Sequence, residues 1–260
     1  MTNQTISQKL NYLILTLTLW LTAGAGMAQT YSLGSDNAEV EWTVEPVERT
    51  PGVEAVRGVV PGTVFGAYVL AGREKDPNWG DNIQQVDRKK YDRSFRYCTS
   101  FRVPEEMSRD RLWLNMDGVN RSAEVVLNGK RLGRLDGFME RGRFDITDIV
   151  RREAGNELEV TVDIPRTPLA NQGSPNYLSS AGWDWMPYVP GLNSGITDKV
   201  WLSGTGQVTM QDPWIRSELV THGKARLSVT VKLTNHTQKD QLTRVRGVIQ
   251  PSGITFEKEM

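Results

Sequence analysis

Cysteine and histidine are scarce in this sequence. Cys98 is the single cysteine, and His222 and His236 are the only histidines. A lone cysteine cannot form an internal disulfide, and a catalytic thiol would need a base nearby, whereas both histidines lie far along the chain. The same scarcity argues against a His/Cys metal site, and no carboxylate cluster has suitable ligand spacing. We therefore expect no metal and no cofactor, with Cys98 acting as a small buried hydrophobe.

Neither sign of charge is in excess. Lysine plus arginine number 31 and aspartate plus glutamate number 31 among the 260 residues, so the formal net charge is zero. A nucleic-acid or anionic-lipid partner would favour a basic excess. Charged residues make up 24% and hydrophobic residues 38% of the chain, which is typical of a folded protein.

Long apolar runs are absent after the N-terminal segment. Lys9 precedes an apolar run at 10–21, and the small residues that follow include Gly26 and Ala28 with the spacing of a cleavage site. This order predicts a secretory signal peptide, residues 1–28, cut near Ala28. The run is shorter than the roughly 20 residues that span a bilayer, so an uncleaved anchor is the less favoured alternative. We expect export to the periplasm or the extracellular space, with no membrane partner after cleavage.

Helical periodicity is weak, and an alternation of apolar and polar residues replaces it. Period-two alternation buries one face of a strand and exposes the other, as in antiparallel sheets. The alternating runs are 40–44, 95–103, 158–164 and 225–233. Asn128-Gly129 between two apolar stretches is typical of a type I′ hairpin turn. Only 63–71 and 145–152 predict short helical turns, and neither is long enough to organise a fold.

The strand pattern starts a second time near Asp212-Pro213. We therefore expect an all-β protein, with a jelly-roll β-sandwich at 29–211 followed by the start of an immunoglobulin-like β-sandwich at 212–260. An immunoglobulin-like sandwich needs about seven strands, and 212–260 offers fewer. The second sandwich is expected to be incomplete and the chain to be a piece of a longer protein.

The densest unusual segment is 182–196, with two tryptophans, two prolines and three glycines. Glycine and proline predict a stiff loop. Indole rings offer flat apolar platforms, and a carboxylate accepts bidentate hydrogen bonds from vicinal hydroxyls. Trp183, Asp184 and Trp185 are therefore candidate sugar-binding residues. The residues alone support equally well two core tryptophans and an Asp184 that caps a turn.

Two other segments favour an architectural role. Within 115–129, Asp117 and Asn120 are expected to bond local backbone. The segment 76–82 contains a single tryptophan and could line a groove, but its composition favours a turn.

The order of these segments resembles the N-terminal sugar-binding domain of glycoside hydrolase family 2, above all its exo-β-glucosaminidase and β-mannosidase branches. The resemblance covers roughly residues 55 to 235. Each matching piece is short, and their shared order makes the resemblance specific. The pieces lie at 60–63, 76–77, 80–82, 97–101, 116–120, 123–125, 127–130, 142–147 and 182–187.

The resemblance implies that an immunoglobulin-like sandwich and a (β/α)8 barrel follow the jelly roll. In that family the barrel carries the two carboxylates of a retaining mechanism, so we expect no catalytic residue in this chain. The Trp-Asp-Trp loop reaches over the barrel mouth, which assigns Trp183, Asp184 and Trp185 to contacts with the terminal sugar of a β-linked oligosaccharide. β-Mannosidases usually have glycine where Met186 stands, and the methionine form is closer to the glucosaminidase branch, so the sugar stays open.

The first hypothesis is that the chain is a non-catalytic piece of a glycosidase, which completes the active site together with the catalytic remainder. Two further hypotheses remain. One is a freestanding carbohydrate-binding module, which predicts a complete domain before a natural end. The other is a structural module without a sugar site. The unfinished second sandwich favours the glycosidase hypothesis.

Overall fold

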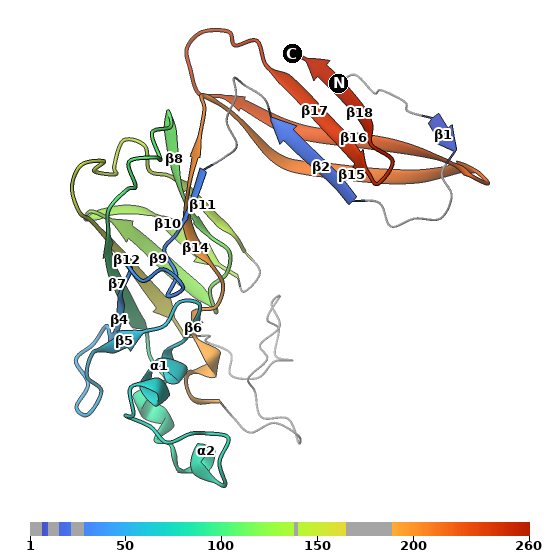
Figure 1. The fold of residues 1–260 in the computed structure, drawn as a ribbon. Helices are drawn as coiled ribbons and strands as arrows, with labels where there is room; N and C mark the ends of the chain where they lie inside the picture. Colours follow the sequence, from blue (N-terminus) through green and yellow to red (C-terminus); the bar gives the residue numbers. More distant parts are fainter. Residues whose placement is uncertain (1–6, 10–15, 22–28, 138–139, 165–188) are drawn as a thin grey trace. The chain divides into compact units, whose positions relative to one another are not determined.

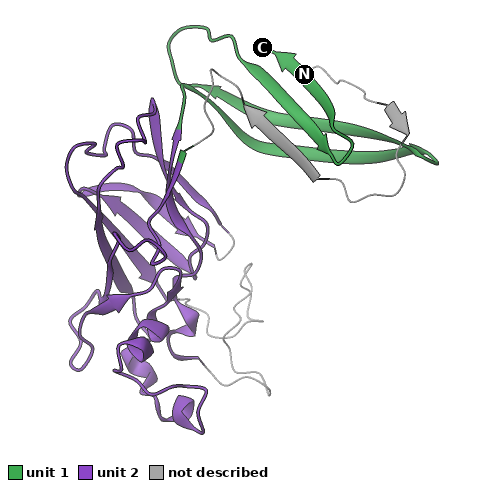
Figure 2. Cartoon of the chain, viewed as in Figure 1, with its two compact units in different colours: residues 1–29, 205–260 green, residues 30–204 purple. Residues whose placement is uncertain are grey.

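The computed structural model describes residues 7–9, 16–21, 29–137, 140–164 and 189–260, and strands dominate it (Figure 1). The chain forms two compact units, residues 30–204 and residues 1–29 with 205–260 (Figure 2). The predicted all-β class is confirmed. Within the described ranges, no helix has both the length and the apolar character needed to cross a membrane.

Two sheets build the unit 30–204. The first has six strands in the order β10-β9-β12-β7-β4-β5, and the second has four in the order β11-β8-β14-β3. The six are β4 (Trp42–Pro46), β5 (Val56–Gly58), β7 (Phe95–Phe101), β9 (Ser122–Leu127), β10 (Lys130–Asp136) and β12 (Asn156–Asp163). The four are β3 (Gln29–Ser32), β8 (Arg111–Met116), β11 (Gly142–Asp145) and β14 (Val200–Thr205).

One hydrophobic core lies between these sheets. Side chains alternate along each strand, so every second residue of β7 and β12 is buried. Phe95 and Tyr97 of β7 and Leu158 of β12 have no exposed surface, and Leu112 and Leu114 of β8 join the same cluster from the other sheet. This shared cluster makes the unit a β-sandwich.

The predicted hairpin at Asn128-Gly129 joins β9 to β10 as expected. Both turn residues have positive φ, 51° and 78°, which asparagine and glycine adopt more readily than other residues. The Asn128 side chain also accepts a hydrogen bond from the Glu157 N–H at 3.0 Å and donates one to the Ile149 carbonyl at 3.0 Å. The turn is therefore tied to the neighbouring strand as well as closed on itself.

Helices are few and short in the described residues. The expected helix at 63–71 is α1 (Val64–Leu70), capped by the Thr63 hydroxyl, which accepts a hydrogen bond from the Gly66 N–H at 3.0 Å. The expected helical stretch at 145–152 is only a turn, in which the N–H groups of Ile149 and Val150 both donate to the Ile146 carbonyl.

Short elements that the sequence did not predict surround the predicted ones. They are β6 (Gly62–Thr63), α2 (Asn82–Gln85), the 3-10 helices η1 (Arg88–Lys90) and η2 (Pro190–Asn193), and β13 (Gly195–Ile196). β6 and β13 pair antiparallel as a two-stranded sheet.

The second unit contains two hairpins. β15 (Val208–Thr221) pairs with β16 (Lys224–Asn235), and β17 (Arg244–Gln250) pairs with β18 (Ile254–Glu259). β15 begins before the expected domain boundary at 211–212 and continues through it, with a register shift between Gln211 and Trp214.

Two strands lie within the segment predicted to be a signal peptide. The backbone of β1 (Ser7–Lys9) pairs with β16, and that of β2 (Thr16–Leu21) pairs with β17. Cleavage near Ala28 and export stay predictions.

Candidate functional site

The predicted sugar-binding residues Trp183, Asp184 and Trp185 lie outside the described residues. The structure does describe residues 189–196, where the chain returns to the sandwich after them. This return segment and the elements that hold it form the described part of the candidate site.

Asn120 holds the return segment from the side. Its Nδ2 atom donates hydrogen bonds of 2.9 Å to the carbonyls of both Leu192 and Asn193. Those two residues have left-handed φ values of 51° and 56°, which turns their carbonyls toward one amide. The backbones of Asn120 and Gly195 also exchange a pair of 2.9 Å hydrogen bonds. Four hydrogen bonds from one residue therefore fix the segment.

Gly195 allows the return segment to lie directly against β6. A Cβ atom on this residue would lie 2.3 Å from the Gly62 carbonyl oxygen and 2.7 Å from the Thr63 Cα, so only glycine fits. One residue earlier, the Ser194 carbonyl accepts a 2.8 Å hydrogen bond from the Val64 N–H at the start of α1. The close approach links the return segment to the first helix of the unit.

Two buried polar atoms beside this junction lack partners. Asn120 Oδ1 and Ser194 Oγ make no hydrogen bond in the described part of the chain, although their residues are only 3% and 2% exposed. Leaving such an atom unpaired costs about 1–3 kcal/mol. The junction therefore has hydrogen-bonding capacity that the described residues do not use.

An aromatic cluster supports the same junction. The Tyr91 ring lies 5.2 Å from Phe65 and 5.4 Å from Tyr68, both edge-to-face, and 6.4 Å from Phe95 in a stacked arrangement. Gly191 of the return segment lies against this cluster, since a Cβ there would be 3.1 Å from the Tyr91 carbonyl oxygen.

The phenols of this cluster are structural donors. Tyr91 Oη donates to Glu74 at 2.8 Å, and Tyr68 Oη donates to the Glu54 carbonyl at 2.6 Å. Burial is the main cause that raises the pKa of Tyr68 to about 12, and burial with the Glu74 hydrogen bond raises the pKa of Tyr91 further. Both phenols therefore stay protonated at neutral pH, which does not suit a general base.

The segment 115–129 is architectural, as expected, but its bonds reach far along the chain. Asp117 Oδ2 accepts a 3.0 Å hydrogen bond from Trp201 Nε1, and Asn115 Nδ2 donates to Ser203 Oγ at 2.9 Å. Together with the Asn120 bonds to 192–195, they correct the expectation that Asp117 and Asn120 bond mainly local backbone.

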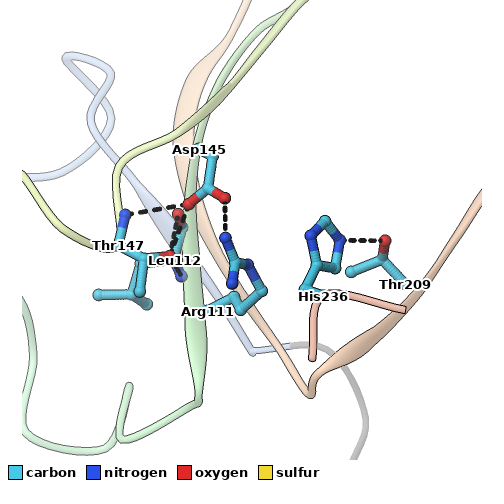
Figure 3. A network of polar contacts seen from close by, with 6 residues as sticks. All are labelled: Arg111, Leu112, Asp145, Thr147, Thr209 and His236. Carbon is cyan, nitrogen blue, oxygen red and sulfur yellow. Dashed lines mark hydrogen bonds and ion pairs between the residues drawn. The ribbon is translucent and has the colours of Figure 1, made fainter. Parts of the chain in front are cut away.

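Figure 3 shows a polar network that ties β8 to the turn after β11. Asp145 Oδ1 accepts from the Thr147 hydroxyl at 2.6 Å and from its N–H at 3.1 Å, and Asp145 Oδ2 pairs with Arg111. Burial raises the pKa of Asp145, but the hydrogen bonds from Thr147 and Arg111 outweigh it and hold that pKa below its ordinary value. Thr147 Oγ1 also accepts from the Leu112 N–H at 3.1 Å, so the network is a structural clamp.

Cys98 lies in the unit 30–204, whereas His236 belongs to 205–260. Cys98 is half-buried on β7, rather than fully buried as expected, and burial raises the pKa of its thiol. His236 contacts Thr209 Oγ1 at 3.0 Å (Figure 3). Among the described residues, no group of three or more His, Cys, Asp or Glu side chains could hold a metal ion.

The unit 30–204 is a β-sandwich of six strands on four. The family model described as "Glycosyl hydrolase 2 galactose-binding domain-like" matches residues 42–198. The chain belongs to this family. The return segment 189–196 lies inside the matched region.

Curated relatives come from longer proteins. The chain is 32% identical over 199 residues to a mannosylglycoprotein endo-beta-mannosidase of Lilium longiflorum, covering 69% of this chain and 21% of that protein. It is 28% identical to an exo-beta-D-glucosaminidase of Streptomyces avermitilis, covering 68% of this chain and 19% of that protein. The chain thus spans about a fifth of the length of these relatives.

Solved structures share the fold at lower identity. The beta-D-mannosidase from Dictyoglomus thermophilum has a TM-score of 0.64 and 21% identity, covering 89% of this chain and 29% of that one. The Amycolatopsis orientalis exo-chitosanase has a TM-score of 0.63 and 20% identity, covering 90% of this chain and 28% of that one.

Proposed function

We propose that this chain is the carbohydrate-binding N-terminal part of an exported family 2 β-glycosidase that hydrolyses O-glycosyl bonds of β-mannosides or β-glucosaminides. Its family membership and its relatives named as mannosidases and glucosaminidases support this proposal. The catalytic pair of carboxylates belongs to a barrel domain outside these 260 residues. We therefore expect the chain alone to hydrolyse no glycoside.

In this proposal, Trp183, Asp184 and Trp185 contact the terminal sugar. The indoles stack on its C–H faces and the carboxylate accepts hydrogen bonds from its hydroxyls. The observation that carries the proposal is the fixed return segment, in which Asn120 makes four hydrogen bonds to 192–195. The anchored segment gives the chain before it one fixed end, and any ordering present before binding lowers the entropy lost when a ligand binds.

A freestanding carbohydrate-binding module is the second candidate. The closed hydrophobic core of residues 30–204 favours it, because a unit with its own core can fold and bind by itself. Under this candidate, sugar binding is as strong in the chain alone as in any longer form.

Ligand-observed NMR with methyl β-D-glucosaminide and methyl β-D-mannoside tests the sugar site. We expect weak, millimolar binding of at least one glycoside by the 260-residue chain and its loss in Asp184→Ala. Asp110→Ala is the matched control, since Asp110 is an exposed aspartate outside the segment 182–196. Binding that survives Asp184→Ala overturns the loop assignment, and hydrolysis of either glycoside by the chain alone overturns the missing-barrel proposal. Micromolar binding favours the freestanding module.

A further inference from the structure

Trp79 presents its indole to solvent. It is 77% exposed, whereas Trp42 and Trp113 of the same unit are 1% and 5% exposed. Tryptophan is highly buried on average in folded proteins because its ring carries a large apolar surface. The exposed ring of Trp79 is therefore a surface that a ligand can cover.

The turn at 76–82 holds Trp79 by its backbone on both sides. The Trp79 N–H donates to the Asp76 carbonyl and the Trp79 carbonyl accepts from the Asn82 N–H, both at 3.2 Å. Asn82 Nδ2 donates to the same Asp76 carbonyl at 2.9 Å, and Asp76 Oδ1 accepts from the Asn78 N–H at 2.9 Å. These bonds confirm the turn that the sequence favoured.

The turn is also attached to the hydrophobic core. It leads into α2. Ile83 within this helix and Val86 just after it are partly buried against the core cluster. Figure 1 shows α2 at one end of the unit, beyond α1. A platform that is already ordered costs little conformational entropy when it binds a ligand.

Polar residues neighbour Trp79 in the turn. Asp76, Asn78 and Asp81, all within three residues of Trp79, are exposed. Asp81 Oδ1 accepts a 2.9 Å hydrogen bond from Gln85 Nε2, and Asp76 Oδ1 accepts bonds within the turn. The Oδ2 atoms of Asp76 and Asp81 accept no hydrogen bond in the described part of the chain. Two carboxylates that each keep one unbonded oxygen thus lie within three residues of Trp79 along the chain.

This combination fits a sugar better than an apolar protein surface. A stable protein interface buries about 800 Å² on each partner around an apolar centre. In the described part of 30–204, Val47 and Leu70 are the only other exposed large hydrophobic side chains. They offer little apolar surface for such a centre. A pyranose has a flat C–H face for one indole and hydroxyls at its edge for carboxylates.

We propose that Trp79, with Asp76 and Asp81, forms an additional sugar-binding platform that takes one pyranose unit of a β-linked oligosaccharide. The proposal rests on the proposed carbohydrate-binding function. The platform binds a sugar unit other than the terminal sugar assigned to Trp183, Asp184 and Trp185. The affinity for an oligosaccharide should therefore rise with its length, and this rise should depend on Trp79.

Calorimetric titration of the 260-residue chain tests this platform with β-1,4-linked glucosamine hexamer, β-1,4-linked mannose hexamer and the corresponding methyl monosaccharides. We expect Trp79→Ala to weaken hexamer binding roughly ten-fold, as for the loss of an aromatic contact, and to leave monosaccharide binding unchanged. Trp79→Phe, which keeps a flat ring, should retain most of the affinity. Trp214→Ala is the matched control, because Trp214 of β15 is 59% exposed.

Three results overturn the platform: no hexamer binding by the wild type, unchanged hexamer binding in Trp79→Ala, or an equal loss in Trp214→Ala. The two proposals fail separately. Asp184→Ala tests monosaccharide binding. If this variant binds the monosaccharide as well as wild type does, a loss of hexamer affinity in Trp79→Ala still supports the platform. Conversely, an Asp184→Ala effect with no Trp79→Ala effect removes the platform and keeps the proposed function.

Discussion

The two compact units bury their strands to very different extents. In 30–204, Phe95, Leu127 and Leu158 have no exposed surface. In 205–260, the buried hydrophobic side chains are Val208, Val245 and Ile249, whereas Trp214, Ile215, Leu219 and Val220 of β15 are 39–76% exposed. Both units are built of antiparallel hairpins, so strand content does not explain the difference.

An opposing sheet, present in 30–204, explains this difference in burial. Every second residue of β7 is buried because an opposing sheet covers one face. From Asp212 onward, all residues of β15 are exposed, so neither face of that stretch is covered. Alternation in the sequence marks the face that can be buried, and burial itself requires a partner layer.

The largest expected effect separates the units by core stability. Leu127→Ala removes a fully buried side chain and should lower the free energy of unfolding of 30–204 by about 2–5 kcal/mol. Leu219→Ala removes a side chain that is 76% exposed and should change stability by no more than about 0.5 kcal/mol. Urea unfolding followed by circular dichroism measures both.

Leu127→Met is the control for the first variant, since a swap of similar volume usually costs less than about 1.5 kcal/mol. Equal losses in Leu127→Ala and Leu219→Ala would show that β15 is covered in solution and would remove the contrast between the units.

The next effect concerns association through β15. Exposed apolar side chains on a long edge strand favour pairing with another copy. Leu219→Lys should weaken self-association roughly ten-fold, because burying one leucine contributes about 1.5–3 kcal/mol. Sedimentation velocity over a concentration series measures it. Leu70→Lys is the matched control in 30–204, since Leu70 is 74% exposed at the end of α1. A wild-type chain that stays monomeric throughout the series contradicts the prediction.

The sequence predicted local features better than long-range ones. The Asn128-Gly129 turn and the short helix at 63–71 depend on residues within a few positions, and both were predicted correctly. The bonds from Asn120 to Leu192 and Asn193 link residues more than 70 positions apart, and the positive φ of Leu192 is unusual for a leucine. No local pattern encodes them.

In the candidate site, too, the sequence predicted local features better than long-range packing. Composition predicted a loop at 182–196, of which the structure describes 189–196 with η2 and β13. Whether a tryptophan in such a segment is buried depends on what packs against it, which composition does not contain. For Trp79, the sequence favoured a turn, and only its exposure in the structure singled out the indole as a candidate binding surface.

The smallest expected difference between the units is electrostatic. Because the folded-state pKa of Asp145 lies below its ordinary value, its clamp stabilises the fold above the unfolded carboxyl pKa of about 3.9 and loses that contribution as the pH falls through the folded value. Asp145→Asn should therefore destabilise 30–204 at pH 6, and its difference from wild type should shrink toward pH 3. The difference should stay below about 1 kcal/mol, since a third of the side chain is exposed.

Glu259→Gln is the matched variant in 205–260, where Arg244 pairs with Glu259 and both side chains are about half exposed. Solvent screens such a pair, so this variant should show no measurable pH-dependent difference from wild type. Urea titrations at steps between pH 3 and pH 6 compare the two. If Glu259→Gln follows the pH course expected for Asp145→Asn, surface charge rather than the partly buried clamp at β8 and β11 governs acid sensitivity, and the electrostatic contrast between the units disappears.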